Sequence, residues 1–178
     1  VVEGVDLAHP DGADRSPASA SVVVREERQA ASPGREPLTS FGERPMDDPT
    51  ASPARTARRL RVAAVQMKFA PTIEGNLAAI ERLLADAARR RVKVVLFPEC
   101  ATTGYGCDFS GLGPAEVRGA LTAVGQLAAR FGVNVLVGSP VFGRGKLYNC
   151  LVVFNDRGEV VHCYAKCHLH ELDRACFT

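Results

Sequence analysis

The last two thirds of the sequence predict a layered α/β domain. Short apolar runs rich in β-branched residues alternate there with longer segments whose apolar residues recur at helical spacing. A turn sequence typical of a β-hairpin follows them. Such an order is typical of a sheet with some parallel strands and at least one helical face. The hydrophobic fraction of 46% and the charged fraction of 24% are ordinary for a globular protein.

The first third of the chain has a different composition. Residues 1–58 carry most of the prolines, are rich in Ala, Ser, Arg and Glu, and have almost no aromatic residues. Such a segment buries too little apolar surface to offset its chain entropy, so we predict a disordered leader over residues 1–58. Because the sequence begins with Val1 rather than Met, we also expect the natural start to lie downstream, with Met46 as the candidate.

The first strand is expected at Leu60–Gln66, and the first helix after Pro71, with Thr72 as its N-cap. A second strand, Val92–Phe97, is apolar throughout its centre and is predicted to be buried on both faces. A strand–helix–strand unit implies parallel pairing and a right-handed crossover. The apolar stripe of this helix is formed by Leu77, Ile80, Leu83, Leu84, Ala87 and Ala88.

The second helix is predicted from its ends. Pro114 suits the first helical position, Glu116 the first turn, and Gly132 the residue that ends the helix. A third strand is expected at Val133–Val137.

Two further strands, Leu147–Phe154 and Glu159–Lys166, flank the hairpin turn Asn155–Gly158. The ordered segment 59–178 therefore contains five predicted strands and two helices.

Charged residues stand at the ends of two of these strands. Pro98 ends the second strand, and Glu99 follows it directly, at the sheet edge where open α/β folds bind their ligands. Lys166 ends the fifth strand. A carboxylate there can act as a general base and an ammonium can stabilise an oxyanion. The alternatives are a solvated loop glutamate and a lysine that reaches out to solvent.

Six segments resemble the nitrilase superfamily of carbon–nitrogen hydrolases, in family order over residues 60–178. They read R-V-A-A-V-Q, N-L-A-A-I, L-F-P-E-C-A-T-T-G-Y, G-V-N-V-L-V-G-S-P, L-Y-N-C-L-V-V-F-N-D-R-G-E-V and Y-A-K-C-H-L. The resemblance implies an α-β-β-α sandwich, incomplete here because only its first strands and helices are present. It also implies a Glu-Lys-Cys catalytic set.

The resemblance assigns roles residue by residue. Glu99 matches the general base of the F-P-E motif, and Lys166 matches the lysine that steadies the tetrahedral intermediate. Tyr105 matches a tyrosine beside the site, where it packs or contacts substrate. Asp173 stands where the family has a further glutamate, so its shorter side chain makes that role uncertain; Glu171 is nearby but out of register.

None of the six cysteines stands in the sequence context of the family's nucleophile. We therefore expect segment 59–178 to be the N-terminal part of a catalytic domain, with the thiolate beyond Thr178, and these 178 residues to be inactive alone. The implied reaction is hydrolysis of a small amide, N-carbamoyl compound or nitrile, with no metal or organic cofactor. The resemblance also implies a homo-oligomer for the full-length protein.

Other functions are less well supported by the sequence. A net charge of +2 and the lack of a long apolar run argue against nucleic acid or membrane partners. Scattered cysteines and the absence of a secretory pattern predict a cytoplasmic protein. Cys163, Cys167, His168 and His170 suit zinc chemically but lack paired spacing, and the glycine-rich stretches lack nucleotide-binding signatures. An inactive domain or a non-catalytic partner-binding protein remains the alternative.

Overall fold

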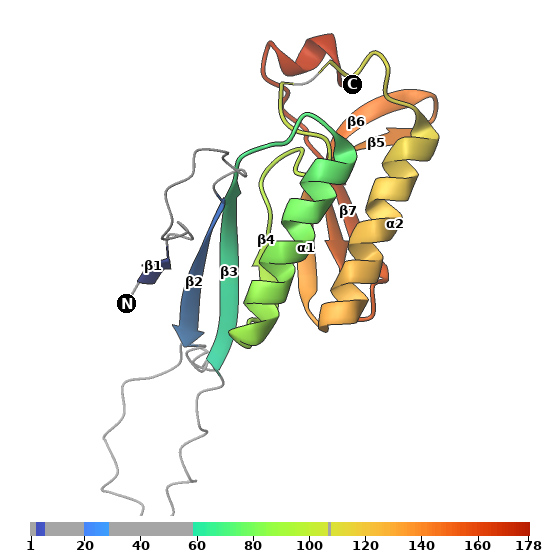
Figure 1. Ribbon diagram of the computed structural model, residues 1–178. Helices are drawn as coiled ribbons and strands as arrows, with labels where there is room; N and C mark the ends of the chain where they lie inside the picture. The colour runs from blue at the N-terminus through green and yellow to red at the C-terminus, as the bar shows by residue number, and fades with distance from the viewer. Residues whose placement is uncertain (1–2, 6–19, 29–58, 107) are drawn as a thin grey trace, which may run out of the picture.

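Two helices pack side by side on one face of a mixed sheet (Figure 1). The computed structural model describes residues 3–5, 20–28, 59–106 and 108–178. Seven strands lie in chain order across the sheet: β1 Glu3–Val5, β2 Ala20–Arg28, β3 Arg59–Met67, β4 Val94–Leu96, β5 Asn134–Gly143, β6 Lys146–Phe154 and β7 Val160–Ala165. The helices are α1 Ile73–Arg89 and α2 Pro114–Phe131, and a short 3-10 helix, η1, spans Asp173–Ala175.

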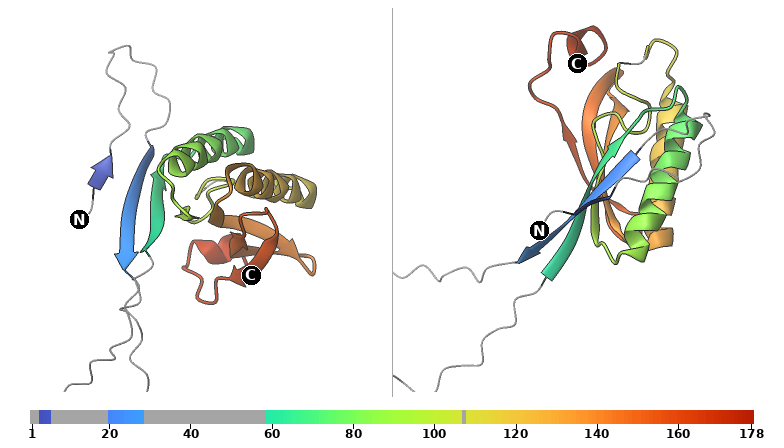
Figure 2. Two further views of the ribbon diagram at one scale, coloured as in Figure 1. Left: turned by 90° about the horizontal axis from the view of Figure 1, so that it is seen from below. Right: turned by 60° about the vertical axis from the view of Figure 1, so that its left-hand side comes forward.

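The three central strands run parallel. β3 pairs with β4 and β4 with β5 in parallel register, and the remaining neighbours are antiparallel. α1 and α2 make the two crossovers between parallel strands, so the predicted strand–helix–strand unit is confirmed. The described part of the chain thus forms one helical layer on one sheet layer (Figure 2).

The helix ends follow from local chemistry as predicted. The Thr72 hydroxyl accepts a hydrogen bond from the main chain of Gly75 at 3.1 Å, which caps α1. The Glu116 carboxylate accepts from the Gly113 main chain at 2.7 Å, and Gly132 ends α2 with a left-handed φ of 62°. Neither of these helices, the longest in the described part of the chain, is long and apolar enough to cross a membrane.

The core lies between the helices and the sheet. Alternate residues of β3, β5 and β6, together with Val95 on β4, are buried against one apolar stripe from each helix, as the two-residue period of a strand requires. Each such buried side chain contributes about 1.5–3 kcal/mol. The largest fully buried side chains include Ile80, Leu84, Val95, Phe97, Val124, Val135, Val137 and Val152.

The second face of the sheet lacks a covering layer within the described residues. Leu96 on β4 is 43% exposed, although the sequence predicts a strand buried on both faces here. That prediction is wrong because both helices pack on the same side, as the right-hand view of Figure 2 shows. Neighbouring positions on this face, Ala64 on β3 and Leu136 on β5, pair with Leu96 in register.

The structure has two strands, β1 and β2, within the segment 1–58 that the sequence predicts to be disordered. β2 pairs antiparallel with the whole of β3, and β1 pairs with β2. β2 contains the apolar cluster Val22–Val24. Without β2, one edge of β3 would present unpaired main-chain groups, and β2 satisfies them. Composition does not report such a contact between distant segments. The rest of segment 1–58 lies outside the described residues, and its disorder stays a prediction.

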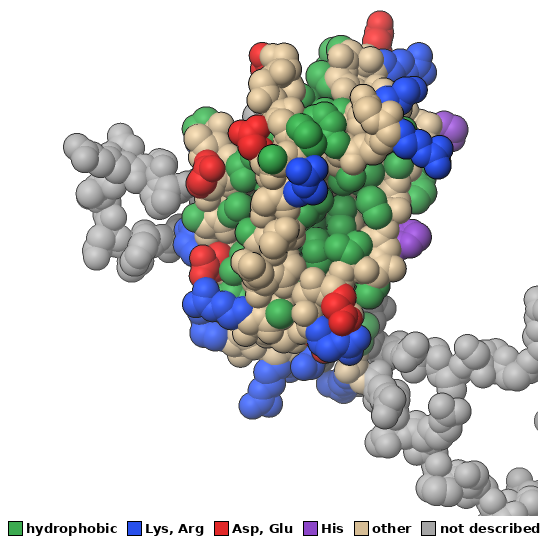
Figure 3. Space-filling view, turned by 90° about the vertical axis from the view of Figure 1, so that its right-hand side faces the viewer, with side chains coloured by type: hydrophobic (Ala, Val, Ile, Leu, Met, Phe, Trp, Pro, Cys, Tyr) green, Lys and Arg blue, Asp and Glu red, His purple; other side chains and the backbone are tan. Residues whose placement is uncertain are grey.

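A groove of about 490 Å³ lies between α2 and the β6–β7 turn. Apolar side chains gather in a hollow on this side of the molecule, with charged residues around them (Figure 3). The groove shares no residue with the strand ends that carry Glu99 and Lys166. Its lining residues are Arg118, Leu121, Thr122, Gly125, Gln126, Ala129, Phe154, Arg157, Gly158 and Val160.

The loop after β4 passes directly against the main chain of β5. A methyl group on Gly138 would lie 2.7 Å from Cys100 N and closer still to Pro98 O and Glu99 Cα. Because all three atoms belong to the main chain, no side-chain movement can relieve the clash. Only glycine fits at position 138 while the loop keeps this path.

We expect Gly138→Ala to lower the free energy of unfolding by about 1–3 kcal/mol, because the new methyl group must push two main-chain segments apart. Urea denaturation measures the change. Gly119→Ala in α2 is the matched control: the added methyl group meets nothing within 4 Å, and the better helix propensity of alanine should raise stability by about 0.5–1 kcal/mol. Equal effects of the two substitutions would contradict the close approach at Gly138.

Candidate functional site

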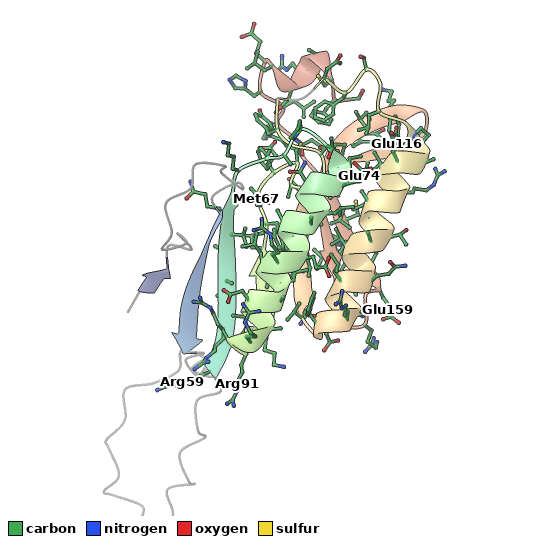
Figure 4. The ribbon with its side chains drawn as sticks, in the orientation of Figure 1. Arg59, Met67, Glu74, Arg91, Glu116 and Glu159 are labelled. Carbon is green, nitrogen blue, oxygen red and sulfur yellow. The ribbon has the colours of Figure 1, made fainter. Side chains whose placement is uncertain are left out.

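The candidate site lies at the end of the sheet where β3 and β4 finish. Figure 4 marks this end by Met67, the last residue of β3, and by Glu74 and Glu116 in the first turns of the two helices. Arg59 and Arg91 lie at the opposite end. Both helices therefore direct the positive ends of their dipoles toward the end of the sheet that carries the site.

Glu99 is placed by a rigid turn. Phe97 N donates to Leu136 O at 2.8 Å and extends the pairing with β5 by one bond, and Pro98 then interrupts it. Cys100 takes a left-handed φ of 51°, which reverses the chain just after Glu99. The carboxylate consequently projects at the end of β4 instead of continuing along the strand.

A buried polar contact anchors the same turn to β5. The hydroxyl groups of Thr102 and Ser139 lie 2.7 Å apart, and both side chains are fully buried. A hydrogen bond between two buried hydroxyls satisfies groups that would otherwise lose their water contacts. This bond and the close approach at Gly138 together fix the turn that carries Glu99.

Lys166 lies between two carboxylates. Its Nζ donates to Glu99 Oε1 at 2.9 Å and to Asp173 Oδ2 at 2.7 Å. The side chains are 33% exposed for Lys166, 41% for Glu99 and 2% for Asp173, so the cluster runs from the protein interior to an open surface. The structure thus brings together Glu99 and Lys166, the two charged residues predicted at strand ends, and places Asp173 beside them.

Asp173 reaches Lys166 because η1 folds back over the sheet end. Its carboxylate also accepts hydrogen bonds from the Tyr105 hydroxyl at 3.0 Å and from His170 N at 3.2 Å. The shorter side chain at this position is therefore long enough to contact the lysine. Glu171, the neighbouring alternative, is exposed.

These contacts shift the acidities of the cluster. The Lys166 ammonium holds the pKa of Asp173 below its ordinary value, against the opposing effect of burial. Hydrogen bonds to Asp173 and Glu99 raise the pKa of Lys166, so the ammonium stays charged at neutral pH. The hydrogen bond to Asp173 raises the pKa of Tyr105, which keeps that hydroxyl protonated.

Asn149 belongs to the cluster but is not singled out by the sequence analysis. It is 4% exposed on β6, and its Nδ2 donates a hydrogen bond to Glu99 Oε1. The main-chain carbonyl oxygen of Asn149 accepts a hydrogen bond from Lys166 N at 2.8 Å. One signal in the sequence could have indicated Asn149. It is a carboxamide inside the apolar run L-Y-N-C-L-V-V-F, and a buried carboxamide requires hydrogen-bond partners.

The cysteines differ in their surroundings. Cys100 and Cys150 are buried, whereas Cys163, Cys167 and Cys176 are exposed. Burial raises the pKa of Cys150 to about 12, so this thiol is not a thiolate at neutral pH. Within the described ranges, His, Cys, Asp and Glu side chains form no group of three or more that could hold a metal ion.

The family model for carbon–nitrogen hydrolases matches residues 61–177. The omega-amidase NIT2 of Danio rerio is 32% identical over 117 residues, which are 65% of this chain and 42% of the relative. The omega-amidase NIT2 of Homo sapiens is 28% identical over 115 residues, 64% of this chain and 42% of the relative. The chain thus spans about two fifths of the length of these relatives.

Solved structures agree on the fold. The NitN amidase from Nesterenkonia sp. AN1 matches with a TM-score of 0.64 at 22% identity, over 67% of this chain and 49% of the amidase. A glutamine-dependent NAD(+) synthetase from Cytophaga hutchinsonii matches with a TM-score of 0.60 at 26% identity, over 67% of this chain and 21% of the synthetase. The nitrilase-type architecture expected from the sequence is confirmed for this part of the sandwich.

We expect Asp173→Asn to make stability less dependent on pH. The folded-state pKa of Asp173 is depressed, so its contribution is present above the ordinary value of 3.8 and is lost as pH falls below it. At pH 7 the substitution should lower the free energy of unfolding by about 1–3 kcal/mol, the usual contribution of a hydrogen bond to a charged group. Urea unfolding at pH 7 and at pH 3 measures both effects.

Asp156→Asn is the control for this experiment, because Asp156 is exposed in the β6–β7 turn. We expect no pH-dependent difference between this variant and the unsubstituted chain. A deficit of Asp173→Asn that is the same at both pH values would show that the Lys166–Asp173 pair does not carry the effect.

Proposed function

Because the chain belongs to the carbon–nitrogen hydrolase family, we propose that it is the base-and-lysine part of an amidase that cleaves small amides through a covalent Glu-Lys-Cys mechanism. The observation that carries the proposal is the Lys166 ammonium, held between Glu99 and Asp173 at the end of the sheet. A base and a fixed positive charge side by side are what acyl transfer through a tetrahedral intermediate requires.

In the proposed reaction, Glu99 takes the proton of a cysteine thiol while sulfur forms a bond to the amide carbon. The carbonyl oxygen becomes negatively charged, and the Lys166 ammonium stabilises it. The protonated Glu99 then gives its proton to the leaving nitrogen, and ammonia departs as the carbon–nitrogen bond breaks. Water attacks the resulting thioester with Glu99 again as the base, releasing a carboxylic acid and restoring the thiol.

The pKa shift of Lys166 suits this role. Two carboxylates hold the lysine protonated, so its third N–H group can donate to a developing oxyanion and the lysine does not act as a base itself. Asp173 supports the lysine from the buried side and leaves its exposed side open. The Tyr105 hydroxyl donates a hydrogen bond to Asp173 and so lies next to the lysine's buried partner.

We propose an amide as the substrate, in preference to a nitrile or an N-carbamoyl compound. Several curated relatives are omega-amidases, and one Nesterenkonia amidase structure contains butyramide. We further propose that the nucleophilic cysteine is supplied from outside these 178 residues; another Nesterenkonia structure carries acrylamide added to an active-site cysteine.

In a longer protein that carries the nucleophile, Glu99→Gln and Lys166→Ala should each lower kcat for butyramide by at least about 100-fold, since each removes a group that acts on the reacting atoms. Ammonia release measures the rate. Turnover of a nitrile but not of butyramide would overturn the choice of substrate.

Arg157 and Glu159 provide the matched control for that experiment. They form an exposed ion pair of 2.8 Å, and Figure 4 shows Glu159 at the far end of the sheet. Glu159→Gln and Arg157→Ala should leave kcat within about twofold, because exposed ion pairs contribute little. If the four variants behaved alike, the assignment of Glu99 and Lys166 would be wrong.

We expect these 178 residues alone to release no ammonia from amides. Cys150 is held as a buried thiol, and none of the cysteines stands in the sequence context of the family's nucleophile. The same ammonia assay, with the longer protein as the positive control, measures this. Activity that Glu99→Gln abolishes would place the nucleophile within residues 1–178.

A further inference from the structure

Asn149 contacts both residues of the proposed mechanism. Its side-chain Nδ2 donates to Glu99 Oε1, and its main-chain carbonyl oxygen accepts from Lys166 N at 2.8 Å. The first bond holds the side chain of the base, and the second holds the main chain of the lysine. One residue of β6 thus joins the loop after β4 to the end of β7.

The two carboxylate oxygens of Glu99 are not equivalent. Oε1 accepts from Asn149 Nδ2 and also from Lys166 Nζ at 2.9 Å. Within the described part of the chain, no side chain or main-chain group donates to Oε2. A proton that binds Oε1 would meet two hydrogen-bond donors already in place, one of them positively charged. Oε2 has no such donor among the described residues, so it can accept a proton more readily.

We propose that Asn149 is a positioning residue that locks Oε1 and thereby presents Oε2 as the oxygen that takes the proton of the nucleophile. The inference rests on the function proposed above. In the first step the S–H bond breaks, its electron pair stays on sulfur, and the proton forms a bond to Oε2. Glu99 then carries the proton on Oε2 until the leaving nitrogen accepts it.

The chemistry of the carboxamide explains why asparagine suits this position. It donates through Nδ2 but is neutral, so it orients Glu99 without competing with Lys166 for the negative charge. An aspartate at position 149 would have nearly the same shape but would place an acceptor against Oε1. An alanine would leave Glu99 held only by the flexible lysine side chain and its own rotamer preference.

The hydrogen bond itself can be tested on the 178-residue chain by NMR of the Asn149 side-chain amide. We expect a downfield, slowly exchanging Nδ2 proton that returns toward the free position in Glu99→Ala, with exchange faster by about tenfold, which corresponds to the loss of one hydrogen bond. The Asn76 side-chain amide is the internal reference, because its hydrogen bonds go to Ala70 N and Ala70 O and not to Glu99. If the chemical shift and the exchange rate of the Asn149 Nδ2 proton were unchanged in Glu99→Ala, the proposal would be overturned.

The positioning role can be tested by kinetics in the longer protein that carries the nucleophile. Asn149→Ala should lower kcat by roughly 10- to 100-fold with KM within about threefold, because misplacement of a base affects the reaction more than substrate binding. Asn149→Asp should lower kcat at least as much. Active-site titration expresses each rate per folded enzyme.

Asn76→Ala is the matched control, since Asn76 is also a buried carboxamide and its side-chain hydrogen bonds go to Ala70 and not to Glu99. It should lose stability yet keep kcat per active site. If Glu99→Gln and Lys166→Ala abolish turnover while Asn149→Ala behaves like Asn76→Ala, the positioning role is wrong and the proposed function stands. If Glu99→Gln and Lys166→Ala leave turnover intact, the proposed function fails first.

Discussion

The ammonium group of Lys166 is the constraint on which the candidate site depends. It joins three segments that are far apart in the chain: the turn after β4 through Glu99, the end of β7, and η1 through Asp173. Asp173 is almost completely buried, and without this partner its charge would be costly to keep in the interior. The folding of the C-terminal segment over the sheet and the electrostatics of the site therefore rest on the same interaction.

Small and neutral residues make that interaction possible. Gly138 lets the main chain after β4 lie directly against β5, which brings Glu99 over the sheet end. Thr102 and Ser139 then hold the loop there through a buried bond that carries no charge. Asn149 orients the carboxylate in the same way. The charged groups of the site are thus held by partners that do not compete for their charge.

Local signals in the sequence predict most of the fold. Thr72 and Gly132 mark helix ends through their own chemistry, and Pro98 marks the end of β4, so the position of Glu99 at a strand end follows from the sequence alone. The features that escape such signals depend on contacts between distant residues. The bond from Asn149 to Glu99 spans 50 residues and requires the strand register. The exposure of Leu96 depends on where both helices pack, and the pairing of β2 depends on the edge of β3 that faces away from β4.

The position of Lys166 at the end of β7 makes the ion pairs of the site depend on a strand at the edge of the described sheet. β7 is the last strand in the sheet order, and all six of its residues are exposed. Strands with so few buried contacts open at a lower free energy than the core between the helices and β3–β5. Local opening of β7 would release the lysine from both carboxylates while the rest of the fold persists. Opening of β7 alone would therefore disrupt the ion pairs of the site before the core between the helices and β3–β5 unfolds.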